Sequence, residues 1–591
     1  MTASTNSTEL RRGGGWLFEE TPPAEIFTPE KLTDEHRLIA RTTDEFVDNE
    51  VLPALDRLEQ KDWDLARRLI VRCGELGLLG VGVPEEYGGL DLDKATSLVV
   101  VERIARSASF ATTFGGQANL CTLPLLLFGS PEQKQRYLPP ILSGRMVAAY
   151  ALSEAGSGSD ALAAKTRAVK QADGAWRLSG EKMWITNGGF ADLIIVFAQV
   201  DGDKLTAFLV EKAFPGVSAG REEHKMGLHG TSTTPILLQD AQVPAANVLG
   251  EVGRGHKVAL NTLNYGRFSL GAMCTGGCRS AIRDAARYAV QRRQFGKPIA
   301  SFGAIRHKLG EMAARTYASE SLVYRTAGLM DRALDASARD GDALARTFEE
   351  YAIESSIAKV AGSETLDYVL DENVQIHGGN GYVKDYPAER HYRDARVNRI
   401  FEGTNEINRL LIPGMLVRRG LKGDLPLVAA AKRLQDELLS PAPALPASGG
   451  EALGAEQRAV QSFKKAALIV LGTAMRTYGD QLQEEQEVLG GAADILIEAY
   501  AAESAVLRAR HAAGPGAELH VAAARVYVND AALRVDAAAR QALAAMAEGD
   551  ALRIRLAALR RVLEAMPINT VALRRRLADA VAGHGGYILN P

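Results

Sequence analysis

Cysteine is scarce in this chain, which has only 4 among its 591 residues. These cysteines are too few and too scattered for a disulfide framework. The single close pair, Cys274 and Cys278, has no second pair and no nearby histidine to complete the four ligands of a structural zinc site. We therefore predict no metal site and expect the cysteines to be small residues of the core.

The sequence also lacks an excess of charge and any long apolar run. A net charge of -3 predicts no general affinity for nucleic acid. The amino terminus from Met1 to Gly15 is polar and carries no apolar stretch of a signal peptide. The apolar run 193–197 is far shorter than the roughly 20 residues that span a membrane. These absences favour a cytoplasmic protein.

The length of the chain predicts several domains, since one domain holds roughly 150 residues. Helical patterns run to about residue 148, short segments rich in Val, Ile and Phe follow between turns, and the helical period then returns. The predicted fold class is multidomain α+β. Its parts, in order, are a loose arm (1–29), a helical domain (30–148), a β-domain (149–255), a helical bundle (256–424), a linker (425–455) and an appended helical domain (456–591).

Local signals predict where several helices begin and which faces they bury. Thr33 precedes two acidic residues and predicts a helix start. Ser130, followed by proline, predicts another, with Tyr137 and Leu138 on the buried side. In the last region, one apolar helical face is formed by Val460, Phe463, Ala467, Val470, Ala474 and Tyr478.

One carboxylate stands out from its local pattern. Glu402 lies between the apolar pair Ile400–Phe401 and the turn-forming run Gly403–Asn405. Such a segment can present the carboxylate into a closed apolar pocket, where burial raises its pKa and makes it a base near neutral pH. The residues alone also allow a solvated glutamate in an ordinary turn, because most carboxylates are exposed.

Two blocks around Glu402 decide between these interpretations. Val374-Gln-Ile-His-Gly-Gly-Asn-Gly-Tyr382 and Ile400-Phe-Glu-Gly-Thr-Asn-Glu-Ile-Asn-Arg409 closely resemble the carboxy-terminal signature of the acyl-CoA dehydrogenases. The resemblance covers about residues 30 to 420. It is closest to the very-long-chain type with a carboxy-terminal helical extension, and to its bacterial relatives. It implies a helical domain, a central β-domain and a four-helix bundle, with Glu402 as the catalytic base. Some members carry that base at the position of Gly266, so Glu402 is the only candidate.

Two loops resemble the flavin loops of this family. On its residues alone, Tyr150–Asp160 is a flexible loop of small residues and hydroxyls, without a G-x-G-x-x-G fingerprint. By resemblance, Ser153 and Thr186 would hydrogen-bond the flavin ring and Trp184 would pack on it. Serine at 153 and alanine at 155 replace the common threonine and proline, but neither removes a needed hydroxyl. The resemblance assigns FAD binding to Tyr150, Leu152, Ser153, Gly158, Ser159, Trp184, Ile185, Thr186, Arg292, Phe295, Gln375, Gly378, Gly379, Thr404 and Glu406.

The segment Arg292–Pro298 combines arginines, an aromatic residue and a turn. That combination suits a pyrophosphate or an acidic partner, but equally a charged helix end. In the family this segment reaches across a subunit contact to the neighbour's flavin, together with Gln375–Gly379. The resemblance therefore implies a homodimer, whose appended domain covers the surface that shorter relatives use to form tetramers. Arg306 stands where glutamine is common, and we expect His377 to be a structural histidine.

The reaction implied by the resemblance is α,β-dehydrogenation of a fatty acyl-CoA to the trans-2-enoyl-CoA, a step of fatty acid β-oxidation. Glu402 would take the α-proton while the β-hydrogen leaves as hydride to the flavin, and an electron-transfer flavoprotein would accept the electrons. Substrate contacts would fall on Ser159, Asn264, Arg267, Phe401 and Gly403. An acyl-CoA oxidase and a largely non-catalytic assembly protein of the same fold are the alternatives.

Two further expectations concern lipid. Small residues in Thr112–Gly116, at the helix end that floors the pocket in this family, leave room for a long acyl tail. Since each buried methylene adds roughly 0.8 kcal/mol, we expect a preference for chains of about twelve carbons or more. Leu552, Leu556, Leu559 and Leu563 share a helical stripe next to arginines. This stripe predicts packing against a core, with weak peripheral membrane contact as a second use.

Overall fold

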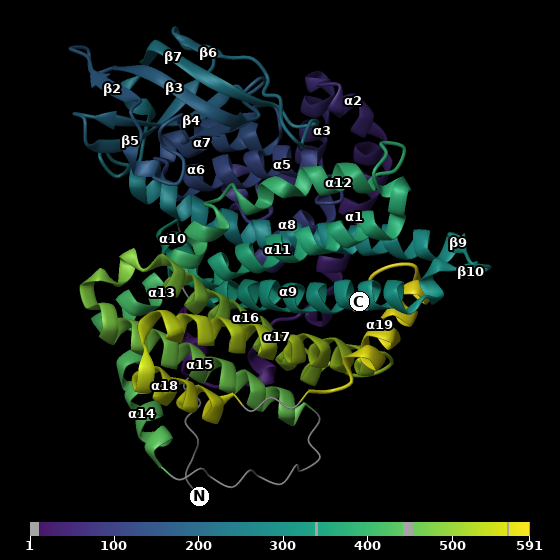
Figure 1. The fold of residues 1–591 in the computed structure, drawn as a ribbon. Coiled ribbons are helices and arrows are strands. Elements are labelled where there is room, and N and C mark those ends of the chain that lie inside the picture. Colours follow the sequence, from purple (N-terminus) through teal and green to yellow (C-terminus); the bar gives the residue numbers. More distant parts are fainter. Residues whose placement is uncertain (1–10, 337–340, 441–452, 564–566, 590–591) are drawn as a thin grey trace, which may run out of the picture.

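The computed structural model of this protein describes residues 11–336, 341–440, 453–563 and 567–589. The β-domain lies at one end of the molecule (Figure 1). The middle of the molecule is crossed by three long helices, α8 (Gly255–Gln291), α9 (Gly303–Asp335) and α11 (Ala352–His377). The helices of the last region cover the opposite side of these three. The predicted multidomain α+β class is confirmed, with the β-domain between helical domains in the order along the chain.

Short helices form the amino-terminal domain, and two of them begin where the sequence predicts. Thr33 and Ser130 each cap a helix through a reciprocal capping box, which satisfies backbone N–H groups that the first turn leaves free. Tyr137 and Leu138 are buried, as expected. The helices are α1 (Asp34–Phe46), α2 (Leu55–Glu59), α3 (Trp63–Glu75), α4 (Lys94–Ile104), α5 (Ala108–Gly115), α6 (Thr122–Phe128) and α7 (Pro131–Leu142).

The β-domain is built on one 8-stranded sheet, in which β1 pairs in parallel with β4 and the other strands follow the order β6-β7-β3-β2-β4-β5-β8. Strand β4 is apolar without alternation because both faces of the sheet are covered. Ile194 lies in a core within the β-domain, whereas Leu193 and Ile195 join the core shared with the helices. The strands are β1 (Ala148–Ala151), β2 (Arg167–Lys170), β3 (Trp176–Thr186), β4 (Leu193–Val200), β5 (Lys204–Glu211), β6 (Val217–Ala219), β7 (Thr233–Val243) and β8 (Val248–Leu249).

The bundle depends on a close approach of α8 and α11. A Cβ at Gly271 would lie 3.0 Å from the side chain of Ala358, and a Cβ at Gly362 would lie 3.2 Å from the Cα of Gly271. These small residues let the two backbones pack together. Cys274 of α8 is buried, as expected for a small core residue. The bundle also contains α10 (Gly341–Glu350), α12 (Ala388–Ala395), α13 (Asn405–Lys422) and the short hairpin of β9 (Arg293–Gln294) and β10 (Lys297–Pro298).

The last region packs directly on the bundle. The predicted apolar face of α15 is buried from Val460 to Ala474, with Tyr478 half-buried at its end. Its residues belong to the same hydrophobic core as α9, so the region is continuous with the bundle. The helices are α15 (Gly454–Tyr478), α16 (Gln486–His511), α17 (Ala517–Met546), α18 (Gly549–Val562) and α19 (Thr570–His584).

One expectation about this region is wrong and another is confirmed. The predicted linker 425–455 contains helix α14 (Leu427–Leu439), which buries Leu434 and packs on α13 and α15. Its proline-rich part, 441–452, lies outside the described residues. The leucine stripe of α18 faces the core, as predicted: Leu559 is fully buried, and Leu552, Leu556 and Leu563 are half-buried against the same core. Weak peripheral membrane contact stays a prediction. Among the helices that the structure describes, none is long and apolar enough to cross a membrane.

The amino-terminal arm is not loose in its described part, from residue 11 onward. Trp16 and Leu17 are only 3% exposed. The backbone N–H of Gly14 donates to Glu354 of α11 at 2.7 Å, and Lys464 of α15 donates to the carbonyl of Trp16. The segment contains turn-forming residues, but it stays packed because its apolar side chains are buried between the bundle and the last region.

Candidate active site

Glu402 lies on a sharp loop just before α13. Its backbone is left-handed with φ of 58°, and Gly403 follows with φ of 77°. Thr404 then caps α13 by accepting a hydrogen bond from the backbone N–H of Ile407 at 3.2 Å. A side-chain-bearing residue is strained in this conformation, so contacts from elsewhere must hold the loop.

Three helices hold this loop through its carbonyl oxygens. Arg267 of α8 donates from Nε to the Glu402 carbonyl at 3.2 Å. Lys359 of α11 donates from Nζ to the Gly403 carbonyl at 2.8 Å. Asn408 of α13 donates from Nδ2 to the same carbonyl at 2.9 Å. Because each donor comes from a different helix, the packing of the bundle fixes where the Glu402 side chain points.

The Glu402 carboxylate is enclosed, although the residue as a whole is half-buried. Its Oε2 is shielded from solvent and has no hydrogen-bond partner among the described residues. Burial raises the pKa of Glu402 to about 7, against the Arg267 guanidinium and the Lys359 ammonium, which both lower it. The expected rise in pKa by burial is confirmed, while the role of Glu402 as the base stays a prediction.

A mainly apolar cavity opens in front of this carboxylate. Gly266 provides the space, because a Cβ at that position would lie only 2.7 Å from Glu402 Oε2. A side chain at 266 and a glutamate at 402 therefore compete for one volume. The walls of the cavity include Ile104 of α4, Thr112, Phe114 and Gly115 of α5, Thr186 of β3, Leu270 and Met273 of α8, and Phe401.

The second predicted flavin loop borders this cavity. Thr186 lines it, and Trp184 is 57% exposed with a left-handed backbone, φ 57°. A large exposed indole on a strained backbone presents a flat apolar surface to a ligand. Of the other residues predicted here, Leu152 and Ile185 are buried, Tyr150 and Ser153 are half-buried, and Gly158 and Ser159 are exposed.

The first predicted flavin loop is held by a buried ion pair that sequence reasoning missed. Glu154 Oε1 accepts from Lys182 Nζ at 2.7 Å and from the backbone N–H of Thr166 at 3.0 Å. Lys182 is fully buried in β3 and therefore ties the two loops together. The sequence signal was a lysine directly before the apolar residues Met183, Trp184 and Ile185. Beyond this anchor the loop is open, since a Cβ at Gly158 would meet nothing within 4 Å.

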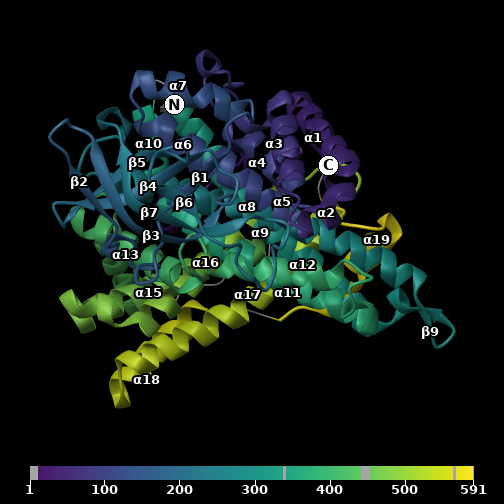
Figure 2. The same ribbon diagram turned by 90° about the horizontal axis from the view of Figure 1, so that it is seen from above.

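A second set of predicted cofactor residues lies at the other end of the bundle. Phe295, between β9 and β10, is 92% exposed, and Arg292, Gln375, Gly378 and Gly379 are exposed as well. Figures 1 and 2 place this hairpin far from the β-domain of the same chain. One chain therefore does not bring this set to the Glu402 cavity, and its predicted role needs a second subunit.

The remaining predicted residues have structural partners. Asn264 accepts from Arg267 at 3.0 Å, and Thr404 and Glu406 belong to the first turn of α13. Arg306 forms an ion pair with Asp579 of α19, so this departure from the family pattern serves the last region. His377 is buried, contacts the Asn373 carbonyl at 2.8 Å and stacks on Tyr288, which confirms that it is a structural histidine.

Lys359 and Asn408 were not predicted as site residues. Asn408 lies inside the signature block itself, and Lys359 is the only charged residue in the small and apolar run 355–363. A single charge in such a run is a signal for a buried partner. Only the structure shows that the partner is the Glu402 loop.

Models of one family match most of this chain. Three describe the N-terminal, middle and C-terminal domains of acyl-CoA dehydrogenases, at residues 33–145, 149–241 and 253–415. A fourth, also described as an acyl-CoA dehydrogenase C-terminal domain, matches residues 462–561. The chain belongs to the acyl-CoA dehydrogenase family. It is thus an oxidoreductase, and the resemblance of the two sequence blocks is confirmed at the level of the family.

Known relatives of this acyl-CoA dehydrogenase differ in how far the match extends. A probable acyl-CoA dehydrogenase of Bacillus subtilis (strain 168) is 48% identical over 582 residues, which covers 97% of this chain and 98% of its own. The structure of an acyl-CoA dehydrogenase complexed with FAD from Bacillus anthracis has a TM-score of 0.96 at 46% identity and covers 98% of this chain and 100% of its own. Butyryl-CoA dehydrogenase from Megasphaera elsdenii, with a TM-score of 0.60 and 35% identity, covers 66% of this chain and 99% of its own.

Proposed function

We propose that this protein converts fatty acyl-CoA thioesters to trans-2-enoyl-CoA by α,β-dehydrogenation, with FAD as cofactor and Glu402 as base. One observation carries the proposal. A carboxylate oxygen without a hydrogen-bond partner faces an apolar cavity, and a pKa of about 7 suits the abstraction of a proton near neutral pH.

The residues beside the cavity fit a flavin. Trp184 offers an exposed indole, Thr186 a hydroxyl at the cavity wall, and Tyr150 a shielded hydroxyl without a partner among the described residues. Open space at Gly156 and Gly158 suits the polar part of the cofactor. Bound there, FAD supplies the acceptor for the hydride that leaves the β-carbon. The FAD complex of the Bacillus anthracis relative supports this assignment.

Glu402 takes the α-proton onto Oε2. An α-C–H beside a thioester is a poor acid, so a general base worth about 10²–10⁴-fold is not sufficient by itself. The backbone N–H of Glu402 donates to the thioester carbonyl and stabilises the charge that develops there. Arg267 and Asn408 keep this backbone in place, and Phe401 and Leu270 exclude water, which preserves the raised pKa.

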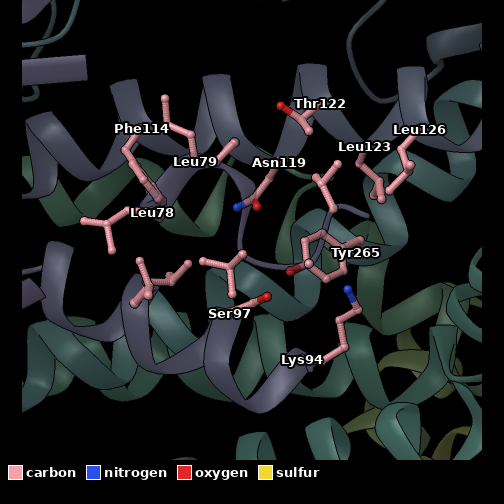
Figure 3. Close-up of a pocket in the computed structure, with 16 residues that line it drawn as sticks. Leu78, Leu79, Lys94, Ser97, Phe114, Asn119, Thr122, Leu123, Leu126 and Tyr265 are labelled. Atoms are coloured by element: carbon pink, nitrogen blue, oxygen red, sulfur yellow. The ribbon is translucent and has the colours of Figure 1, made fainter. Parts of the chain in front are cut away.

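We infer that long acyl chains are preferred, from about twelve carbons upward. Gly115 and Thr112 leave the Glu402 cavity open where bulky residues would close it. A second cavity adjoins the first and shares Val101, Phe114 and Asn119 with it. It continues past leucine side chains to Tyr265 (Figure 3). A tail that enters it would gain roughly 0.8 kcal/mol for each methylene that it buries.

The second cavity can be tested through Ala118, which lines it without lining the Glu402 cavity. Ala118→Phe should lower kcat/KM for a sixteen-carbon acyl-CoA by about tenfold or more and leave an eight-carbon substrate nearly unaffected. Ala118→Ser, which adds little volume, is the matched control. An unchanged ranking of chain lengths in the phenylalanine variant, or best activity of the wild type on butyryl-CoA, would exclude the long-chain preference.

We further infer a homodimer in which each β9–β10 hairpin completes the cofactor site of the other subunit. The exposure of Phe295 at the hairpin tip supports this, because a single large exposed aromatic flanked by cations suits a partner surface. Phe295→Asp should then lower FAD content together with the dimer mass in light scattering. An electron-transfer flavoprotein is the acceptor that we propose.

The proposed reaction is tested by adding palmitoyl-CoA to the purified yellow protein without oxygen. Bleaching of the flavin that is lost in Glu402→Gln supports dehydrogenation with this base. Rapid peroxide formation in air would instead indicate an oxidase, and no bleaching with acyl chains from four to eighteen carbons would indicate a non-catalytic protein. Turnover above about one per cent in Glu402→Gln would contradict the role of Glu402.

A further inference from the structure

We propose that Lys359 of α11 is a positioning residue for this reaction, which holds the Glu402 loop in place and supplies a positive charge to the base. The inference rests on the proposed function, because it requires Glu402 to be the group that takes the proton. It assigns a chemical role to a lysine that is fully buried in the bundle.

Lys359 binds the loop on both sides of Thr404, directly after the two left-handed residues Glu402 and Gly403. Its Nζ donates to the Gly403 carbonyl at 2.8 Å and to Asn405 Oδ1 at 2.6 Å. These contacts bracket Thr404, so the ammonium fixes the direction in which the chain leaves Glu402. Hydrogen bonds from a charged donor in a shielded place are stronger than those between neutral groups.

The anchor behind Lys359 is built on the same helix. Asn405 donates from Nδ2 to Ser363 Oγ at 3.1 Å and to Glu364 Oε1 at 3.0 Å, and Glu364 in turn accepts from Arg409. Lys359 and Ser363 are one helical turn apart and therefore face the loop together. This side of α11 thus forms a rigid support for the two left-handed residues that carry the base.

The charge of Lys359 acts on Glu402 as well. Burial lowers the pKa of Lys359 to about 8, although the Glu402 carboxylate raises it. In Glu402 the same ammonium works against the rise in pKa that burial causes. The charged or titratable groups that face this pair are Arg267 and Cys274 of α8, Glu406 of α13, and Tyr150 of β1. Loss of Lys359 would leave Arg267 as the only cation that acts on the base in this set.

The experiment compares pH profiles of kcat for the wild-type holoenzyme and for Lys359→Met, which keeps the length of the side chain but not its charge. We expect the acidic limb of the Lys359→Met profile to move to higher pH. Its activity should fall by about tenfold at pH 7 and recover in part at pH 9, with KM little changed. Lys359→Arg should keep the limb near its wild-type position but lower kcat at every pH, because a planar guanidinium cannot place the same two bonds.

Lys464→Met is the matched control, since Lys464 is also a buried lysine but pairs with Glu503 in the last region. It should lower the thermal midpoint and leave the acidic limb unmoved. Far-UV circular dichroism and flavin absorbance check that each variant is folded and loaded. If the methionine variant does not fold, Lys359→Gln keeps a donor for the Gly403 carbonyl and should show the same moved limb.

An acidic limb at the wild-type position in Lys359→Met, with activity reduced equally at all pH values, would overturn the proposal. The proposal would also be overturned if the acidic limb of the kcat profile moved as far in Lys464→Met as in Lys359→Met. Failure of the proposed function itself looks different, because the wild-type enzyme would then show no acyl-CoA turnover that depends on Glu402.

Discussion

Two sites of this protein differ in whether their carboxylates have hydrogen-bond donors. Where α16 meets α9 and the short turn Pro29–Lys31, Arg508 donates to Glu320 at 2.6 Å and to Glu30 at 2.7 Å, and its own side chain is fully buried. In the active site, Glu402 Oε2 has no donor among the described residues. Arg508 and Glu320 are fully buried, Glu30 is half-buried, and Glu402 Oε2 is shielded from solvent, so the donors that face each carboxylate decide whether it is held ionised.

The pKa values follow this difference. Burial alone would raise the pKa of Glu30, but the Arg508 guanidinium outweighs burial and holds that pKa below its usual range. For Glu402 burial prevails, although Arg267 and Lys359 oppose it, and the pKa reaches about 7. A paired carboxylate therefore joins parts of the architecture, whereas an unpaired one remains a base.

The sharpest test of the comparison is Glu402→Gln. The amide is nearly isosteric but cannot take a proton, so kcat should fall by about 10²–10⁴-fold or more while FAD content and folding are retained. Stopped-flow reduction of the flavin measures this effect. A parallel loss of FAD would mean that Glu402 is a structural residue like Glu30.

The matching change at the paired site is Arg508→Met. It removes the shared cation from the half-buried Glu30 and from the buried Glu320, which keeps Arg279 at 3.6 Å, and should lower the free energy of unfolding by roughly 3–5 kcal/mol. Chemical denaturation measures the change. Protein that remains folded should keep its wild-type kcat, because Arg508 does not line the Glu402 cavity. A normal unfolding midpoint would show that these pairs do not secure the last region.

The comparison also predicts a difference in the pH dependence of stability. The folded pKa of Glu402 lies above its unfolded value, so the folded protein binds more protons between about pH 4.5 and 7, and stability falls as pH rises through this window. Glu402→Gln should remove this contribution and be more stable than wild type at pH 8 by about 1–2 kcal/mol. Glu30 has the opposite sign, because its stabilising charge is lost as pH falls. Unfolding curves of wild type and Glu402→Gln at pH 5 and pH 8 test the Glu402 term, and equal differences at both values would contradict it.

The smallest effect is expected for an ion pair that is not buried. Arg553 contacts Asp550 at 2.9 Å on α18, and both side chains are more than 80% exposed. Arg553→Ala should leave the unfolding midpoint and the activity unchanged, because water and salt screen such a pair. A loss as large as that of Arg508→Met would show that burial is not what separates the sites.

Local sequence patterns predict much of this fold and part of the site. The capping signals at Thr33 and Ser130 act within one helical turn, so they can be read locally. The apolar run 193–197 is typical of a strand that is covered on both faces. The apolar neighbours of Glu402 and the turn after it allowed either an enclosed or a solvated carboxylate, and the resemblance of the two sequence blocks to a family favoured the enclosed one. The packed arm and helix α14 could not be predicted, because turn-rich or alanine-rich segments do not show locally which apolar surface covers them.

By itself the sequence determined the order of the domains, the family signature and a glutamate placed between apolar residues and a turn. Only the tertiary structure decided which groups surround that glutamate. Arg267 is 135 residues away from Glu402 along the chain, and Lys359 is 44 residues from Gly403, yet both reach the same loop. A pKa depends on every charge and apolar wall within a few ångströms, and that neighbourhood exists only once the helices have packed.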